Sequence, residues 1–478
     1  MEHLYEATAV QIAAAVAAGE ISAVDVVSAH LARIEAVNPA VNAVTNVLAD
    51  GALDAARAID RRRAAGEALG PLAGVPFTVK ENIHVAGSAT TMGVPAMRNL
   101  VAAADAPPVR RLRAAGAVPI GRTNLPDLTI AGLHTTSTLY GDTRNPWDPD
   151  GRTPGGTSGG DGVAVATGMA PLGLGNDSGG SLRNPATFNG ITALKPTYGR
   201  FPADHRISGR EPTLASQLFP VDGPLARSVA DLQLAFDVLA GADAQDPRVV
   251  PAPLDGPPLS GPVTVGLVTD LDGDRMHPDV RAGLAAAADA LADAGYRIEE
   301  VQAPALAEAL AVYSGLISTE FSLVWPTLQP LLSETSRLHM ELMMRRQPPS
   351  DLSGYIQLTA ARLGVQRVWT QFLDRYPLLL GPVYTELPPP PSVPVDADEQ
   401  QRTMSPLRLC TATTLVGVPA VAVAAGVIGG LPQGVQVIGR MYREDLCLTA
   451  ASAIEQRLGV LTPINPTAAA EQRSTQIG

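Results

Sequence analysis

The sequence is poor in lysine, cysteine and aromatic residues, and each shortage narrows what the protein can be. Of 35 basic residues in the 478-residue chain, only Lys80 and Lys195 are lysines. With 47 acidic residues the formal net charge is −12, which argues against direct nucleic acid binding or docking on an anionic membrane through a basic patch. The two cysteines, Cys410 and Cys447, are far apart and provide neither a disulfide framework nor a CxxC motif.

Targeting and membrane signals are also missing from the sequence. The N-terminal segment has no basic region and is interrupted by glutamates. The apolar run from Val163 to Leu174 is too short and too rich in glycine to span a bilayer. Two scattered cysteines suit a reducing compartment. We therefore expect a cytoplasmic protein that does not bind a membrane.

Metal-binding spacings are absent as well. The seven histidines show no HxxxH, HExxH or mixed Cys/His cluster. The acidic stretch Asp270–Asp274 begins like a calcium loop but lacks the glycine and glutamate required at the sixth and twelfth positions. We expect no metal and no cofactor.

Hydrophobic periodicity predicts an α/β protein with a central sheet. The clearest pattern is a βαβ-like unit, with a strand at 263–268, a helix at 278–294 and a strand at 296–301. Near the N-terminus, Ser22 is the predicted N-cap of a helix that Asn38–Pro39 ends.

No internal repeat or long linker interrupts the chain, so we expect one domain over residues 1–478. Residues 302–375 predict helices with large apolar side chains, which suit either core helices or the wall of a substrate pocket. Residues 411–439 predict strands broken by glycine and proline. We expect the residues of a substrate pocket to come from 125–140 and 300–410.

The two lysines are the first candidates for chemistry. Arginine cannot lose its proton in a protein, whereas a buried lysine can become a neutral base. A GC-rich codon bias explains the scarcity of lysine equally well. Composition alone therefore leaves a chemical and a structural role open for both lysines.

A stretch rich in glycine and serine is the second candidate, because residues 151–200 hold 13 of the 45 glycines. Glycine lets backbone N–H groups converge on one point, as they do around a phosphate or an oxyanion. The GxxxxGK[ST] and GxGxxG motifs of nucleotide sites are not matched. A structural loop and an oxyanion hole remain. The oxyanion donors would be the N–H groups of Ser178, Gly179, Gly180 and Ser181, with Ser181 as the nucleophile.

Ser158 is a competing nucleophile, because Gly156–Gly160 matches the GxSxG elbow of α/β-hydrolases. Such an enzyme needs a strand before the serine and a downstream histidine, for which His205, His277 and His339 are available. The preceding residues, NPWDPDGRTPGG, do not predict a strand, and this disfavours the elbow hypothesis.

The same stretch resembles the amidase signature family. The family's central signature is similar to GGTSGGDGVAVATGMAPLGLGNDSGGSLRNPATFNGITALKPTYG, and its upstream block is similar to GVPFTVKENIHVAGSATTMG. The similarity extends over nearly the whole chain, with a signature core at about residues 70–200 and a variable helical region at about 300–410. The resemblance implies the amidase signature fold, a central mixed β-sheet covered by helices on both faces, and a serine amidase with a Ser-Ser-Lys triad.

Carried over by position, the resemblance places the base on Lys80 and the nucleophile on Ser181. The bridging residue, a serine in the family, falls on Thr157, and the resemblance implies a cis peptide bond before it. Further family positions are matched by Ser158, Asp177 and Arg183. Two more departures from the family pattern are Asn176 in place of threonine and Ala424 in place of proline.

These residues predict a serine hydrolase that cleaves the C–N bond of a small-molecule carboxamide through an acyl-enzyme on Ser181, with an esterase side activity. Two alternatives remain open at this point. One is the ammonia-releasing subunit of a glutamine-dependent tRNA amidotransferase, which belongs to the same family, and the other is a non-catalytic binding protein on the same fold. The sequence does not name the amide, and it leaves a homodimer open.

Overall fold

The structure, a computed structural model, describes residues 3–130, 133–207, 209–271, 273, 275–391, 394 and 396–466. Asp272 and Asp274 of the acidic stretch lie outside the described residues, as does the part of the predicted domain after residue 466.

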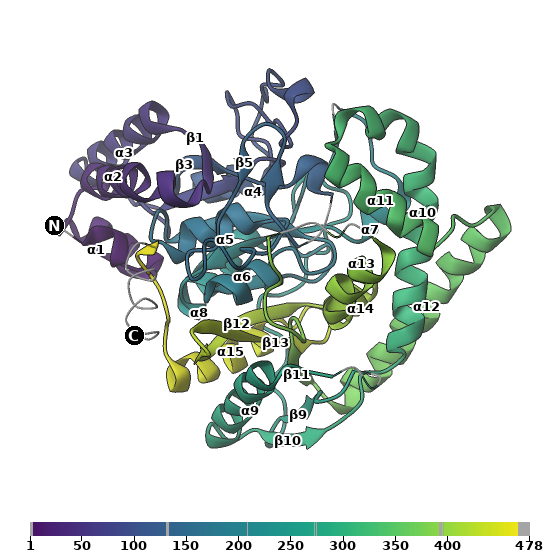
Figure 1. The fold of residues 1–478 in the computed structure, drawn as a ribbon. Coiled ribbons are helices and arrows are strands. Elements are labelled where there is room, and N and C mark those ends of the chain that lie inside the picture. Colours follow the sequence, from purple (N-terminus) through teal and green to yellow (C-terminus); the bar gives the residue numbers. More distant parts are fainter. Residues whose placement is uncertain are drawn as a thin grey trace, which may run out of the picture.

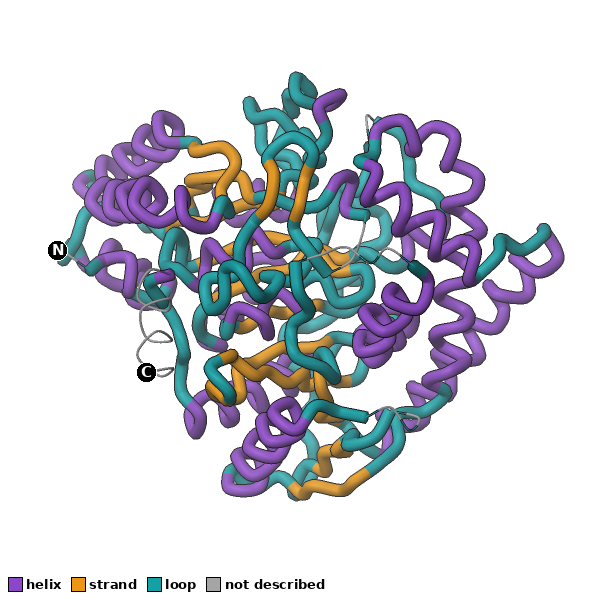
Figure 2. The backbone as a smooth tube through the Cα atoms, viewed as in Figure 1, coloured by secondary structure: helices purple, strands orange, loops and turns teal. Residues whose placement is uncertain are grey.

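An eleven-stranded sheet takes its strands from most of the chain (Figures 1 and 2). In spatial order the strands are β1 (Val44–Val47), β3 (Val118–Thr123), β2 (Pro76–Lys80), β6 (Leu172–Asp177), β8 (Val221–Ala226), β7 (Thr192–Lys195), β12 (Ala420–Ile428), β13 (Leu431–Gly439), β11 (Leu378–Pro382), β9 (Thr264–Leu267) and β10 (Arg297–Glu300). A separate pair consists of β4 (Thr136–Ser137) and β5 (Gly141–Asp142).

The sheet is mixed, as predicted. β2 pairs in parallel with both β3 and β6, while β6, β8, β7, β12 and β13 pair in antiparallel order. β9 pairs in parallel with β10, and α9 (Pro278–Asp293) connects them, so the predicted βαβ unit is confirmed.

The remaining α-helices fall into three groups along the chain. They are α1 (Ala9–Ala18), α2 (Ala23–Val41), α3 (Ala49–Ala64) and α4 (Pro107–Ala114); α5 (Gly159–Ala166), α6 (Arg183–Asn189), α7 (Leu214–Leu218) and α8 (Val229–Leu239); and α10 (Leu306–Leu328), α11 (Glu334–Arg346), α12 (Leu352–Arg375), α13 (Ala397–Met404), α14 (Arg408–Val416) and α15 (Glu444–Leu458).

Helices cover both faces of the sheet, and β13 shows the division between them. Successive side chains of a strand point to opposite faces. On β13, Gln436 accepts a hydrogen bond from Arg183 of α6 at 2.9 Å, whereas Val435 and Val437 join the core cluster that includes α9 and α15. The α5–α6 pair therefore lies on one face, and α8, α9 and α15 pack together on the other (Figure 1). The predicted fold is confirmed.

Two elements differ from the sequence-based prediction: α2 ends later than predicted, and α14 is a helix where strands are predicted. Ser22 is the N-cap of α2, as predicted, because its side chain accepts the N–H of Asp25. The helix does not end at Pro39, however, but continues to Val41, since a proline near the C-terminal end removes only one backbone donor and Asn42 terminates the helix in a left-handed conformation.

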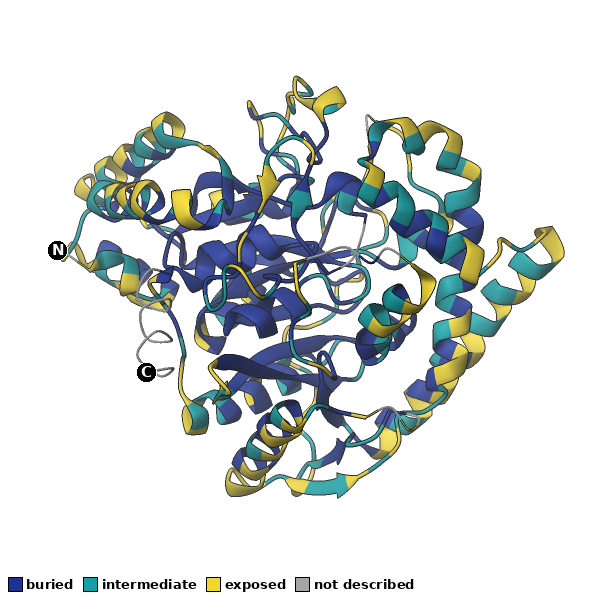
Figure 3. Cartoon of the chain, viewed as in Figure 1, coloured by how far each residue is buried: buried dark blue, intermediate teal, exposed yellow. Residues whose placement is uncertain are grey.

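The second difference is α14, which occupies residues predicted to begin a run of strands. A short apolar run does not distinguish a buried strand from a buried helix. Here α14 packs against α10 and α12 around a second hydrophobic core, while the outer side of α12 is exposed (Figure 3).

Candidate active site

Lys80 stands at the end of a strand that is buried on both sides. All five residues of β2 are buried, and Lys80 itself is inaccessible to solvent. The guanidinium of Arg122 on β3 is also buried and donates hydrogen bonds to the backbone carbonyls of Lys80 at 3.1 Å and Ile83 at 2.6 Å. These contacts fix the backbone from which the Lys80 side chain extends.

The amine of Lys80 contacts three side-chain oxygens. Its Nζ lies 2.6 Å from Thr157 Oγ1, 2.9 Å from Ser158 Oγ and 2.7 Å from Asn176 Oδ1. A neutral amine has two N–H bonds and one lone pair. If Lys80 is neutral, it donates to two of these oxygens and accepts the proton of a hydroxyl, as a base next to Thr157 must.

Asn176 has a role that the sequence analysis did not assign. In the sequence, Asn176 stands out only as a departure from the family pattern. An amide oxygen has no proton to give and always accepts. Because Asn176 Oδ1 takes one amine hydrogen, it leaves the other hydrogen and the Nζ lone pair for the two hydroxyls.

Burial sets the charge of Lys80. It lowers the pKa of Lys80 to about 7, although the negative charges of Asp161, Asp177 and Asp222 work in the opposite direction. A substantial share of the protein therefore carries a neutral amine near neutral pH.

Asp161 is the first of these carboxyl groups. It lies in the first turn of α5, is buried, and its Oδ1 accepts a hydrogen bond from Thr78 Oγ1 at 2.9 Å. Thr78 and Lys80 are two residues apart on β2, so their side chains point to the same face of the sheet. Burial raises the pKa of Asp161 to about 7, against hydrogen bonds and the charges of Lys80 and Arg122.

This arrangement predicts how activity responds to pH. If Lys80 is the base of a catalysed reaction, only its neutral amine can accept a proton, and kcat/KM should fall about tenfold per pH unit as the pH drops below the pKa of Lys80 near 7. Asp161→Asn removes a negative charge that favours protonated Lys80, so the acid limb should move to lower pH. Measuring kcat/KM against pH for both proteins checks this, and an unchanged or raised midpoint in Asp161→Asn would contradict it.

The loop that carries Thr157 is packed too closely to carry side chains at its glycines. The Gly156–Thr157 peptide bond is cis, as the resemblance implied. A Cβ on Gly159 would lie 2.2 Å from Thr135 Oγ1, and a Cβ on Gly160 would lie 2.6 Å from the backbone of Asn124. Gly159 and Gly160 are the first two residues of α5, and they allow the first turn of this helix to pack closely against Thr135 and Asn124.

Ser158 does not occupy a nucleophile elbow. Residues 143–158 form a loop, so the strand that an elbow requires before the serine is missing from this described segment. Ser158 is fully buried, and its Oγ donates to the carbonyl of Asn176 at 3.1 Å while accepting from Lys80. The side chain is thus held in place by two contacts in the interior.

Ser181 lies at an opening in an otherwise closed segment. Every residue from 153 to 197 is buried except Ser178, Gly179 and Ser181, which are partly exposed. The carbonyl of Ser181 accepts the N–H of Ser158 at 3.2 Å, which brings the Thr157–Ser158 loop alongside the Ser181 loop. A small molecule reaching this segment from solvent therefore meets Ser181.

Asn184 ties the same two loops together and was not identified from the sequence. Its side chain accepts from the N–H of Gly156 at 2.9 Å and donates to the carbonyls of Gly156 at 2.7 Å and Gly180 at 2.8 Å. The amide of one side chain thus bridges the residue before Thr157 and the residue before Ser181.

Asp177 and Arg183 form a fully buried ion pair beneath the Ser181 loop. The carboxylate accepts from Arg183 Nε at 3.0 Å and Nη2 at 2.9 Å. Although burial works in the other direction, the charge of Arg183 holds the pKa of Asp177 well below its usual range. Arg183 also donates to Thr413 on α14 and Gln436 on β13, so the pair anchors the loop to the C-terminal part of the sheet.

Two of the four N–H groups predicted to bind an oxyanion already have a hydrogen-bond partner within the protein. The N–H groups of Gly179 and Gly180 already donate to Asp177 Oδ1, at 3.0 and 2.7 Å. The carboxylate draws these two amides toward the protein interior. Of the four predicted donors, the amides of Ser178 and Ser181 are the better candidates to face a ligand.

Lys195 resembles Lys80 in burial and charge but not in its partners. It is buried, and burial lowers its pKa to about 7 as well. Its Nζ donates to the backbone carbonyls of Pro196 at 3.0 Å and Val418 at 2.7 Å. Because a carbonyl has no proton to transfer, partners rather than pKa distinguish the two lysines.

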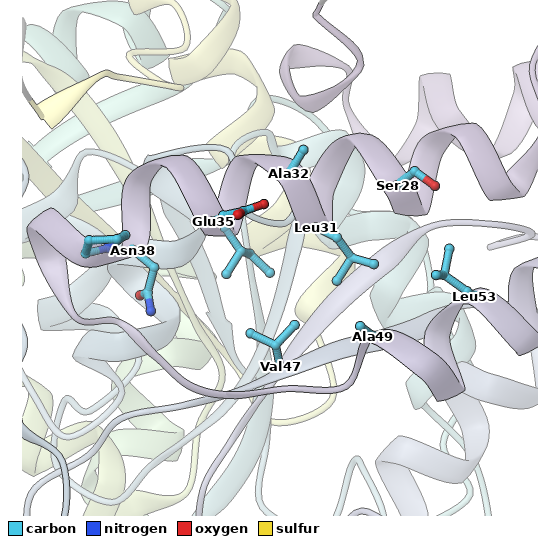
Figure 4. A pocket seen from close by; sticks show the side chains of 10 residues that line it. Ser28, Leu31, Ala32, Glu35, Asn38, Val47, Ala49 and Leu53 are labelled. Carbon is cyan, nitrogen blue, oxygen red and sulfur yellow. The ribbon is translucent and has the colours of Figure 1, made fainter.

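One hollow in the described surface lies away from this site. It measures about 670 Å³ and lies between α2, β1 and α3 (Figure 4). A smaller cavity lies between segments 125–140 and 300–410, from which we expect the residues of a substrate pocket to come. Its walls are Leu133, His134, His339, Pro389, Pro390, Pro394, Thr403 and Met404.

The described residues contain neither a helix that could span a membrane nor a cluster of metal-binding side chains. None of their helices is long and apolar enough to cross a membrane. Within the same residues, no group of three or more histidine, cysteine, aspartate or glutamate side chains is arranged to hold a metal ion.

Comparisons with known proteins agree with one another. The sequence profile of the family described as Amidase matches residues 25–448. An indoleacetamide hydrolase of Bradyrhizobium diazoefficiens is 42% identical over 461 residues, covering 96% of this chain and 88% of that protein. A glutamyl-tRNA(Gln) amidotransferase subunit of Salinispora arenicola is 34% identical, covering 97% and 99%. The structure of 6-aminohexanoate cyclic dimer hydrolase complexed with substrate superimposes with a TM-score of 0.81 at 28% identity, covering 95% and 98%.

Proposed function

The chain belongs to the amidase family and is an amidase, and from that premise we propose that it hydrolyses a small carboxamide through an acyl-enzyme on Ser181, with Lys80 as base and Thr157 as proton relay. One observation carries this proposal. A buried amine lies 2.6 Å from the hydroxyl of Thr157, whose loop is hydrogen-bonded to the partly exposed Ser181 loop. We further propose that the chain acts as one domain, with the variable region at 300–410 shaping the substrate pocket.

The proposed reaction begins with two linked proton transfers. Neutral Lys80 takes the proton of Thr157 Oγ1 while Thr157 takes the proton of Ser181 Oγ. The Ser181 oxygen bonds to the amide carbon, and the carbonyl oxygen becomes an oxyanion facing the N–H groups of Ser178 and Ser181. The proton returns from Lys80 through Thr157 to the nitrogen, which leaves as a neutral amine or ammonia. Water then gives a proton along the same path to Lys80, and its oxygen bonds to the acyl carbon. The bond from this carbon to the Ser181 oxygen breaks as the proton returns through Thr157 to Ser181, and the acid is released.

The substrate class follows from the most similar of the relatives described above. The name of the indoleacetamide hydrolase refers to a primary amide whose acyl group is an arylmethyl group, and the similarity favours this class of substrate for the present chain. We therefore expect ammonia release from indole-3-acetamide and from simpler arylacetamides. A panel of aryl and aliphatic amides, compared by kcat/KM, tests this, and no turnover of any primary amide would contradict it.

A second candidate is the amidotransferase function, favoured by a relative that matches over 97% of this chain. A glutaminase component of such a complex would release ammonia from glutamine and respond to added partner proteins. Indole-3-acetamide and glutamine, compared in the isolated protein, separate the two proposals. We expect activity on the first without any partner.

Replacing the Thr157 hydroxyl tests the relay. Thr157→Val keeps the shape of the side chain but can neither accept nor return a proton. General acid–base steps contribute about 10²–10⁴-fold, so we expect kcat for an amide to fall by that factor. An activated ester should lose less, because its leaving group needs no returning proton. Thr157→Ser should remain active. Turnover of the amide at the wild-type rate by Thr157→Val would remove Thr157 from the path.

A further inference from the structure

Tyr313 reaches the Ser181 loop from a distant part of the chain. It lies on α10, within the variable helical region, and its hydroxyl donates a hydrogen bond to the backbone carbonyl of Ser178. Its ring stacks on Phe219, with centroids 5.0 Å apart and planes inclined by 28°. Burial raises the pKa of Tyr313 to about 12, so the hydroxyl keeps its proton and remains a donor across the neutral range.

The contact fixes one end of a peptide group whose other end is already held. The carbonyl of Ser178 and the N–H of Gly179 belong to the same planar unit. The carbonyl accepts from Tyr313, and the N–H donates to Asp177 Oδ1 at 3.0 Å. A rotation of this peptide would break both hydrogen bonds at once.

This peptide lies where such rotation is otherwise easy. The peptide rotates about ψ of Ser178 and φ of Gly179, and Gly179 has a φ of 156°, a value that glycine adopts readily. Rotation would turn the carbonyl of Ser178 away from Tyr313. It would also turn this oxygen toward the carboxylate of Asp177, where the N–H of Gly179 now lies. The loop would have to rearrange, which would displace the N–H groups of Ser178 and Ser181 that are proposed to stabilise the oxyanion.

We propose that Tyr313 is a positioning residue that holds the Ser178–Gly179 peptide in the orientation the oxyanion site requires. The inference rests on the proposed function, because it assigns the Ser181 loop to an oxyanion. A Cβ on Gly179 would lie 3.3 Å from the Tyr313 hydroxyl, so the phenol lies directly over this loop. Tyr313 thereby links the variable helical region to the nucleophile loop.

The test removes the hydroxyl and keeps the ring. In Tyr313→Phe we expect kcat to fall about 10–100-fold, less than the 10²–10³-fold typical of a lost oxyanion donor, because Tyr313 acts through the backbone. KM should change little. An amide and an ester of the same acid should slow by the same factor, unlike in Thr157→Val, because both form the same oxyanion.

A pair of substrates distinguishes positioning from general damage. Sulfur is a weak hydrogen-bond acceptor, so a thionoester gains little from the oxyanion donors. We expect Tyr313→Phe to slow an ester strongly and its thionoester weakly, which lowers the oxygen-to-sulfur ratio of kcat/KM. Phe219→Leu is the matched control, because it loses the ring stack but keeps the hydroxyl, and its ratio should stay at the wild-type value.

The outcomes separate this inference from the proposed function. An unchanged rate in Tyr313→Phe, or a slower rate with an unchanged oxygen-to-sulfur ratio, overturns the role of Tyr313 while wild-type turnover still depends on Ser181. Turnover that survives Ser181→Ala overturns the proposed function itself.

Discussion

Ser181→Ala should lose on the order of 10⁶-fold in kcat for an amide, as expected when a nucleophile is removed from a unit that acts together. Ser181 is the proposed nucleophile and lies at the opening of a segment that is otherwise buried. Because its side chain is partly exposed, the substitution should leave the melting temperature nearly unchanged. Ammonia release and labelling by a fluorophosphonate check the loss of activity, and thermal denaturation of the wild type and the variant checks the melting temperature.

Ser158→Ala is the matched control for this experiment. It removes a neighbouring hydroxyl that is fully buried and accepts a hydrogen bond from Lys80 at 2.9 Å. We expect slower turnover, because Lys80 loses one of its three oxygens, but persistent labelling. Labelling that survives Ser181→Ala and disappears in Ser158→Ala would assign the nucleophile to Ser158.

The second large effect concerns the base. Lys80→Met keeps the length of the side chain and removes the amine, while Lys80→Arg keeps a charge that cannot be lost. We expect both variants to lose about 10⁴-fold in kcat, the upper end for an acid–base group, because each proton transfer in the proposed path passes through Lys80. An active Lys80→Arg protein would exclude Lys80 as the base.

Lys195→Met is the control for the loss of a buried lysine. Arginine is the poorer control here, because Lys195 is fully buried and a guanidinium is larger than the amine it would replace. Methionine leaves two buried carbonyls without their donor, which costs about 1–3 kcal/mol in the free energy of unfolding. Thermal denaturation should therefore show a lower melting temperature, while kcat stays near the wild-type value.

The fold and the candidate site residues could be proposed from the sequence because both depend on local or short-range patterns. The βαβ unit repeats apolar residues at strand and helix spacing, and the N-cap at Ser22 needs only its own turn. Thr157 and Ser181 lie within one contiguous signature, and Lys80 lies in a second block of the same family pattern. A pattern of residue types was sufficient to nominate all three.

The supporting contacts could not be predicted because they depend on where side chains and amides point. The Tyr313–Ser178 hydrogen bond joins residues 135 positions apart, and no periodicity relates them. The engagement of Gly179 and Gly180 by Asp177 depends on backbone direction, which the letters GNDSGG do not specify. Asn184 is one of many polar residues in a stretch rich in glycine and serine, and the sequence does not show that its side chain bridges two loops.

The most direct test of the central claim is to trap the acyl-enzyme. The protein is mixed with an arylacetamide in excess, quenched in acid and digested with trypsin, which cuts after Arg152 and Arg183 and releases Thr157, Ser158 and Ser181 in one peptide. Fragmentation in the mass spectrometer then locates the acyl group. We expect an acyl adduct on Ser181 that accumulates in the wild type and is absent from Ser181→Ala. An adduct on Ser158, or product formation in Ser181→Ala, would contradict it.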